Sequence, residues 1–288
     1  LRKEGTRALC EVMEGMFQLA EINISSNEIY PDGGESMAAL VEKCAKLSVL
    51  KVAENNLTNW GQSCAPLESI VANALRTDTL KVLHFQGNVL REPGAAAIAR
   101  LIKESKTLEE IDLSRAQLGP DGAISIADAL TGKESNLKVL KLGENSIGSR
   151  GSTPLVEALC TSGHTLARLD LRKNNIPEGC VLGWIDLLLH HRDEWTVEEI
   201  DLSGNRISSS LIDDFSELPK RAANRYGIVT GASRMAPLKK FRDNYEAQKS
   251  GIFEDAGGKH GAEEEEAVES EGEDAGTPIS REGVPMDA

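Results

Sequence analysis

The sequence predicts an α/β solenoid, a horseshoe in which a parallel β-sheet lines the concave face and helices cover the convex face. The first observation is that residues 137–147, LKVLKLGENSI, share their spacing of apolar residues and a closing Asn with six other stretches. The closing positions are 27, 55, 88, 116, 145, 174 and 205, which lie between 28 and 33 residues apart. The second observation is that each stretch precedes a segment with the apolar period of a helix.

Each repeated stretch indicates a short strand followed by a turn. Leu140 and Leu142 are expected to face the core, while Val139 and Lys141 face the open side, because side chains alternate along a strand. The closing Asn is expected to bond backbone groups of the turn and to link neighbouring coils, since stacking would bury those groups unpaired. We interpret as a structural Asn ladder the residues Asn27, Asn55, Asn88, Asn145, Asn174 and Asn205, with Ala116 as the exception in the column.

A helix is predicted after each turn, as in the stretch AAAIARLIKES at residues 95–105. A glycine is expected at each helix start, where it allows close approach of the neighbouring backbone. These glycines are Gly33, Gly61, Gly94, Gly122, Gly151 and Gly179. Trp60, Trp184 and Trp195 fall in turn or helix segments, where we expect them to pack in the core, with an exposed contact on the convex face as the alternative.

Composition divides the chain into three segments. Residues 1–226 are predicted to form the array, and the alignment of Leu1 with the residues that follow each Asn leads us to expect further repeats upstream. Residues 227–255 are a basic linker or a C-terminal capping helix. Residues 256–288 are predicted to be a disordered acidic tail, because residues 252–288 hold twelve acidic and two basic side chains and little apolar surface.

Several functional classes are disfavoured by the sequence. It contains no run of about 18 apolar residues, so we expect no membrane span. The net charge of −14 disfavours nucleic acid as a partner. The five cysteines are scattered and form no CxxC pair, which favours reduced thiols and a cytoplasmic location, with nuclear or nuclear-envelope association as an alternative. We expect no cofactor, no metal ion and a monomer.

The outward-facing strand residues are the candidate site, because the alternation frees them from the core and stacks them in rows. A mixed, polar surface suits a protein partner better than a small molecule. The predicted partner-binding residues of the concave face are Lys51, His84, Glu110, Asp112, Lys141, Arg168, Asp170, Arg172, Glu199 and Asp201. Two readings stay open: a solvated face whose neighbouring charges neutralise each other, or a docking surface that uses Arg168 and Arg172. No catalytic residue is predicted, since no Ser or Cys nucleophile lies beside His84 in the repeat register.

The period, the LxxLxLxxNxL pattern and the following helix resemble the ribonuclease-inhibitor type of leucine-rich repeat over roughly residues 1–210. The sequence therefore favours a non-enzymatic protein-interaction scaffold. The final repeat, VEEIDLSGNRISSSLIDDF, and the acidic tail also resemble Ran GTPase-activating proteins. This resemblance implies, as an alternative, a GTPase activator for a Ran-like small GTPase with an Arg in a turn after an early strand. Arg91 and Arg115 are the nearest candidates, although neither lies in the local sequence of that family.

Overall fold

The computed structural model describes residues 1–131, 135–160, 165–190 and 197–208. The chain divides into the units Leu1–Arg242 and Asp243–Ala288, and all described residues belong to the first unit. Residues 209–226 of the predicted array, the predicted basic segment at 227–255 and the predicted acidic tail at 256–288 lie outside the described residues.

The strands of the described residues form one parallel sheet of seven strands, whose spatial order equals their order in the chain. Each strand is three residues long and pairs with the next in the register that the repeat pattern predicts, so that Leu50 lies opposite Leu83. The strands are β1 (Glu21–Asn23), β2 (Val49–Lys51), β3 (Val82–His84), β4 (Glu110–Asp112), β5 (Val139–Lys141), β6 (Arg168–Asp170) and β7 (Glu199–Asp201). This arrangement confirms the predicted α/β solenoid class.

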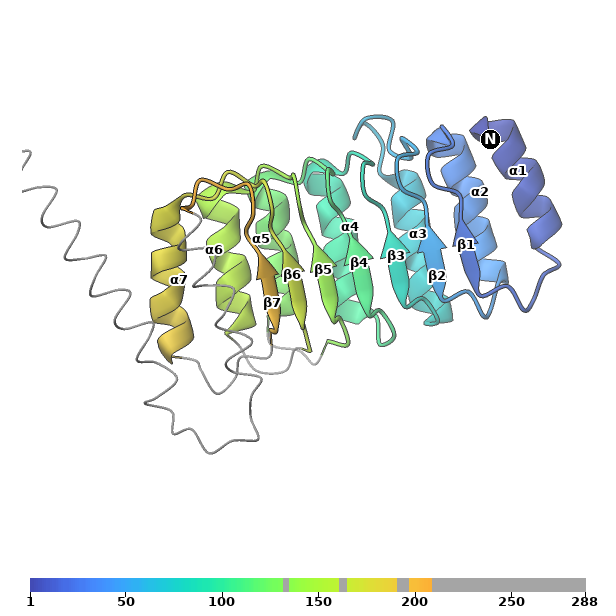
Figure 1. The fold of residues 1–288 in the computed structure, drawn as a ribbon. Coiled ribbons are helices and arrows are strands. Elements are labelled where there is room, and N and C mark those ends of the chain that lie inside the picture. The colour runs from blue at the N-terminus through green and yellow to red at the C-terminus, as the bar shows by residue number, and fades with distance from the viewer. Residues whose placement is uncertain (132–134, 161–164, 191–196, 209–288) are drawn as a thin grey trace, which may run out of the picture. The chain divides into compact units, whose positions relative to one another are not determined.

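A helix precedes β1, and a helix follows the turn after each of the strands β1 to β6. The helices are α1 (Arg2–Met13), α2 (Tyr30–Lys43), α3 (Ala65–Thr77), α4 (Arg91–Glu104), α5 (Gly119–Leu130), α6 (Gly148–Leu159) and α7 (Glu178–His190). Figure 1 shows these helices side by side along one side of the sheet, which leaves the other face of the strands open. None of the helices in the described ranges combines the length and the apolar composition needed to cross a membrane.

The hydrophobic core lies between the sheet and the helices. The central residue of each strand points into it, and Leu50, Leu83 and Ile111 are completely buried. The apolar residues of the helices meet them from the other side, as Ile98 and Ile126 do. Replacing one such leucine by Ala is expected to cost about 2–5 kcal/mol, because the buried contacts are lost and the surrounding structure fills the cavity only in part.

Close packing of neighbouring coils requires a glycine at Gly151, near the start of α6. A Cβ atom added there would lie 2.7 Å from Cγ2 of Ile147 and 2.9 Å from both Cβ of Ala123 and Cα of Pro120. These distances are shorter than normal contacts between carbon atoms. Helices α5 and α6 therefore approach each other in a way that any larger residue would prevent.

The side chains of the Asn column form a ladder of hydrogen bonds between coils. Asn145 illustrates the pattern: its Nδ2 donates to the carbonyls of Leu113 and Leu142 at 2.9 Å each. Its Oδ1 accepts from the backbone N–H of Ala116 at 2.8 Å and of Leu118 at 3.3 Å. The side chain of Asn145 thus forms hydrogen bonds to backbone groups of its own turn and of the turn in the preceding coil. The same connection joins Asn27 to Asn55, Asn55 to Asn88, Asn145 to Asn174 and Asn174 to Asn205.

The ladder has a gap at Ala116. No amide oxygen is present there to accept from the coil before it, so the N–H of Asn88 donates to the carbonyl of Phe85 at 3.3 Å and the N–H of Leu90 donates to the carbonyl of Ala116 at 2.8 Å. The side chains of Arg115 and Glu54 form an ion pair across the intervening coil. A Cβ atom on Gly87 would lie 2.8 Å from Cγ of Glu54, so the glycine makes room for this pair.

Two predictions about the connection between β2 and α3 are wrong. Gly61 does not start a helix, because this connection is longer and α3 begins only at Ala65; Gly61 instead has a left-handed backbone with φ +78°. Trp60 does not pack in the core, since 64% of its surface is exposed. Trp184 is buried as expected, and Trp195 lies outside the described residues.

Candidate functional site

The candidate site is the open face of the sheet, where the register places the predicted residues in two rows. The first row comes from the third residue of each strand and the second row from the first residue. The first row runs Asn23, Lys51, His84, Asp112, Lys141, Asp170 and Asp201. The second runs Glu21, Val49, Val82, Glu110, Val139, Arg168 and Glu199. Arg172 belongs to neither row, because it follows β6 in the turn.

The charges in the middle of this face neutralise each other. Nζ of Lys141 lies 2.7 Å from Oε1 of Glu110, and Nε2 of His84 lies 3.0 Å from the same oxygen. Burial by itself raises the pKa of Glu110, but the hydrogen bonds from Lys141 and His84 outweigh it, so the pKa of this carboxyl lies below its ordinary value. Lys51 is likewise paired, with Glu21 at 2.7 Å. His84 and Lys141 thus share one carboxylate oxygen of Glu110.

Asp170 lies in a less favourable environment. Burial raises the pKa of its carboxyl above the ordinary value, and the nearby carboxylates of Asp201 and Asp112 add to this effect. Hydrogen bonding to the backbone N–H of Arg172, at 2.9 Å, and the charge of its guanidinium, whose Nε is 3.4 Å from Oδ2, offset only part of it. The face is thus short of positive charge around Asp170.

The position of Arg172 differs from that expected from the sequence. We expected Arg168 and Arg172 to act together on one strand, whereas Arg168 is the first residue of β6 and Arg172 lies in the turn, two residues after the strand ends. Arg172 lies over Gly143 of the preceding coil, where an added Cβ atom would be 3.0 Å from its Cγ. Arg168 remains on the strand face and lines the hollow described next.

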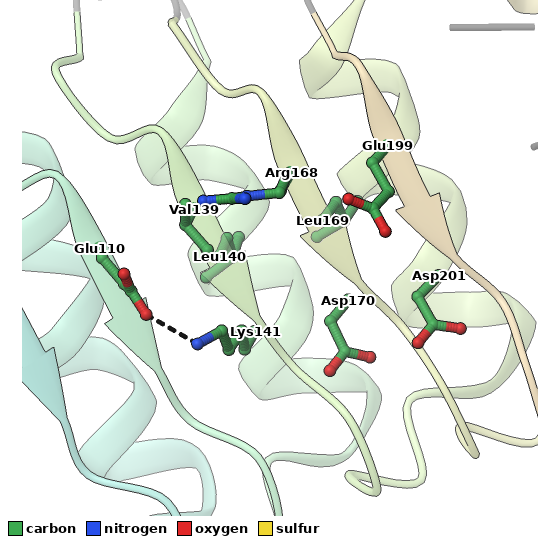
Figure 2. Close-up of a pocket in the computed structure, with 9 residues that line it drawn as sticks. All are labelled: Glu110, Val139, Leu140, Lys141, Arg168, Leu169, Asp170, Glu199 and Asp201. Atoms are coloured by element: carbon green, nitrogen blue, oxygen red, sulfur yellow. Dashed lines mark hydrogen bonds and ion pairs between the residues drawn. The ribbon is translucent and has the colours of Figure 1, made fainter. Parts of the chain in front are cut away.

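An open hollow of about 320 Å³ lies over strands β4 to β7. Figure 2 shows the guanidinium of Arg168 extending over Val139, away from Glu199, while Lys141 points to Glu110. In the described part of the chain, no ion pair forms at Arg168, Glu199 or Asp201. The residues that line the hollow are Glu110, Val139, Leu140, Lys141, Arg168, Leu169, Asp170, Glu199 and Asp201.

The sequence did not single out two buried polar groups that lie beside this face. Oγ of Ser114 and Oε1 of Gln86 are buried and make no hydrogen bond to another described group. Both follow their strands by two residues, so the repeat register places them at the same edge, but the sequence pattern does not show whether a partner reaches them. No group of three or more His, Cys, Asp or Glu residues suited to a metal ion occurs in the described ranges.

Comparisons with known proteins match the fold. The family described as Leucine Rich Repeat matches residues 104–127 and residues 196–218. Ribonuclease inhibitor of Mus musculus is 28% identical over 58% of this chain and 36% of its own length, and that of Sus scrofa is 25% identical over 74% and 46%. RAN GTPase-activating protein 2 of Arabidopsis thaliana is 30% identical over 49% of this chain and 24% of its own length.

The chain therefore spans less than half the length of each of these relatives. The matches agree with the seven-stranded parallel sheet, the helices that follow β1 to β6 and the Asn hydrogen bonds between coils. Together, these observations show a leucine-rich-repeat protein whose repeats are of the ribonuclease-inhibitor type.

Proposed function

We propose that this chain is a non-enzymatic binding module that holds a protein partner against the open strand face. The observation that carries the proposal is the unequal pairing of charges on that face. Lys51, His84 and Lys141 are occupied by carboxylates of neighbouring strands. Within the described residues, Arg168, Glu199 and Asp201 form no ion pair, although all three line one hollow.

Side chains of a partner protein can pair with the charged groups that the fold leaves unpaired in this hollow. Charged groups at the centre of an interface contribute to specificity when a partner supplies the opposite charge in the right place. Arg168 offers a guanidinium that can bind a carboxylate through two hydrogen bonds, and Glu199 and Asp201 offer acceptors on the next strand. The similarity to ribonuclease inhibitors, whose name states a protein target, supports a protein as the ligand.

The experiment compares three immobilised forms of the full chain against bovine ribonuclease A and against cytosolic extract, with bound proteins identified by mass spectrometry. The test variant is Arg168→Glu, and the control is Arg100→Glu, which makes the same charge change on the exposed surface of α4. We expect a defined set of proteins on the wild type and on the control, and at least tenfold less on Arg168→Glu. Equal capture by all three forms would show that the strand face is not the docking surface.

A second candidate is activation of a Ran-like GTPase, favoured by the 30% identity to RAN GTPase-activating protein 2. Of the two arginines singled out from the sequence, Arg115 is held by Glu54, whereas Arg91 is exposed. An arginine that reaches a bound nucleotide raises GTP hydrolysis by orders of magnitude. The test is single-turnover hydrolysis by Ran with and without the full chain. Stimulation that is lost with Arg91→Ala but kept with Arg100→Ala would favour this candidate over the binding module.

A further inference from the structure

A second exposed surface lies where the strands turn into helices. Three consecutive coils place large side chains there: Tyr30 at the start of α2, Trp60 before α3 and Arg91 at the start of α4. Tyr30 is 43% exposed, Trp60 is 64% exposed, and Arg91 is exposed as well. We call these three residues the turn-edge row. Figure 1 shows the longer connection between β2 and α3, which carries Trp60, between the starts of α2 and α4.

The backbone under the turn-edge row is unfavourable for large side chains. Tyr30, Trp60 and Arg91 have φ angles of +60°, +56° and +53°. This left-handed region is costly for residues with a Cβ atom and easy for glycine. At the position equivalent to Tyr30 and Arg91, the coils that begin α5 and α6 carry Gly119 and Gly148 with similar φ angles. Tyr30 and Arg91 therefore occupy a position that other coils fill with glycine.

Hydrogen bonds hold the Trp60 segment in this conformation. The N–H of Trp60 donates to Oδ1 of Asn56 at 2.6 Å. The hydroxyl of Thr58 is fully buried, donates to the carbonyl of Val89 and accepts from the N–H of Gly61. These bonds fix the segment to the next coil. The indole of Trp60 is therefore held in place before a partner binds, which lowers the entropic cost of binding.

The cation of the row lies next to the aromatic segment and is not neutralised. A Cβ atom on Gly61 would be 3.0 Å from both Cδ and Nε of Arg91, so the arginine side chain passes directly over the residue that follows Trp60. No carboxylate of the described ranges lies within ion-pair distance of Arg91, whereas Arg115 of the following coil is paired. Arg91 is therefore available for a carboxylate from outside.

We propose that the turn-edge row binds a short extended segment of a partner protein, with apolar side chains against Tyr30 and Trp60 and a carboxylate on Arg91. Trp, Tyr and Arg are the residue types that dominate the binding energy of protein interfaces. Neighbouring strands are about 5 Å apart and packed helices about 8–10 Å apart, so two steps from Tyr30 to Arg91 at the helix starts span about 10–20 Å. Roughly three to six residues of extended chain cover this distance. This surface is separate from the strand face and adds a second contact.

The test is selection of a random library of twelve-residue peptides, displayed on phage, against the full chain. Selected peptides are then synthesised, and their affinities are measured by fluorescence anisotropy. We expect peptides that combine an Asp or Glu with apolar residues, and at least tenfold weaker binding to Trp60→Ala and to Arg91→Gly. Arg91→Gly keeps the left-handed turn, because neighbouring coils have glycine at this position.

Phe17→Ala is the matched control, because Phe17 is an aromatic residue with 69% exposure elsewhere on the surface. Peptides that bind Phe17→Ala and Arg168→Glu like the wild type, but not Trp60→Ala, support the proposal. Selected peptides that depend on Arg168 instead, or that carry no acidic residue, would overturn it. Trp60→Gly supplies an independent check: an unchanged or higher melting temperature is expected, and a marked decrease would mean that Trp60 serves the fold.

Discussion

Replacing Asn145 by Ala tests how much one rung of the Asn ladder contributes to stability. The change removes the acceptor for the buried N–H groups of Ala116 and Leu118 and the side-chain donor to the carbonyl of Leu113. A buried polar group without a partner costs about 1–3 kcal/mol. If nothing relaxed, three such groups would cost about 3–9 kcal/mol.

The natural gap at Ala116 shows how far the turn relaxes. There the N–H of Asn88 reaches the carbonyl three residues before it, and the N–H of Leu90 reaches the carbonyl of the following coil. The same adjustment is open to Ala116 and Leu118 in Asn145→Ala, which would recover part of the lost bonding. We therefore expect a loss of about 2 kcal/mol in the free energy of unfolding.

Urea denaturation followed by circular dichroism measures this loss. With a urea dependence of about 2 kcal/mol per M, the midpoint should fall by about 1 M. Asn23→Ala is the control, because the side chain of Asn23 is exposed and only accepts from the N–H of Ser25, so its midpoint should change little. Ala116→Asn should raise the midpoint by restoring the missing rung. Equal midpoints for Asn145→Ala and Asn23→Ala would refute the ladder's contribution to stability.

Two further predictions concern ionisable groups. Because the pKa of Asp170 is raised in the folded protein, its ionisation costs stability as the pH rises from its ordinary value of 3.8 through the folded pKa. Asp170→Asn should thus be more stable than the wild type at pH 7 but not near pH 3. Urea denaturation midpoints at both pH values measure this difference. A gain of equal size at pH 3 would contradict the electrostatic cause. Burial and nearby Glu14 raise the pKa of Cys10 to about 11. Iodoacetamide at pH 8 should therefore modify Cys10 far more slowly than partly exposed Cys64, as measured by mass spectrometry of the intact protein. Equal rates would contradict the burial of Cys10.

The repeat pattern alone was enough to predict the sheet, the order of its strands and the residues that share each row. This works because a period of two along the strand and a fixed repeat length leave only one register in which Leu50, Leu83 and Ile111 are all buried. The Asn positions follow from the same spacing. Each coil of a repeat array contacts only its neighbours, so the structure of a coil can be predicted from its own sequence.

The details of the site depend on contacts that the spacing does not contain. Whether Lys141 turns to Glu110 or to Asp170 is decided by side-chain rotamers, and the sequence allows both. Arg172 was assigned to the strand because its position fits the alternation, but the strand ends at Asp170 and the missing side chain of Gly143 draws Arg172 over the preceding coil. Trp60 was assigned to the core by its residue type, although the five additional residues of its repeat, 33 against 28 in the repeat before it, place it outside.

Because of the gap at Ala116, we expect the array to unfold as two cooperative blocks. Solenoid stability is close to a sum over neighbouring coils, so a weaker junction defines where one block can open without the other. Amide rungs within each block are buried, whereas Arg115 and Glu54, which bridge this junction, are half exposed and therefore weakened by dissolved ions. Salt is therefore expected to weaken this ion pair, as it weakens the other exposed ion pairs between coils, such as Arg150 with Asp121. The hollow over β4 to β7 and the turn-edge row lie on opposite sides of this junction, so a partner that bound both would stabilise it.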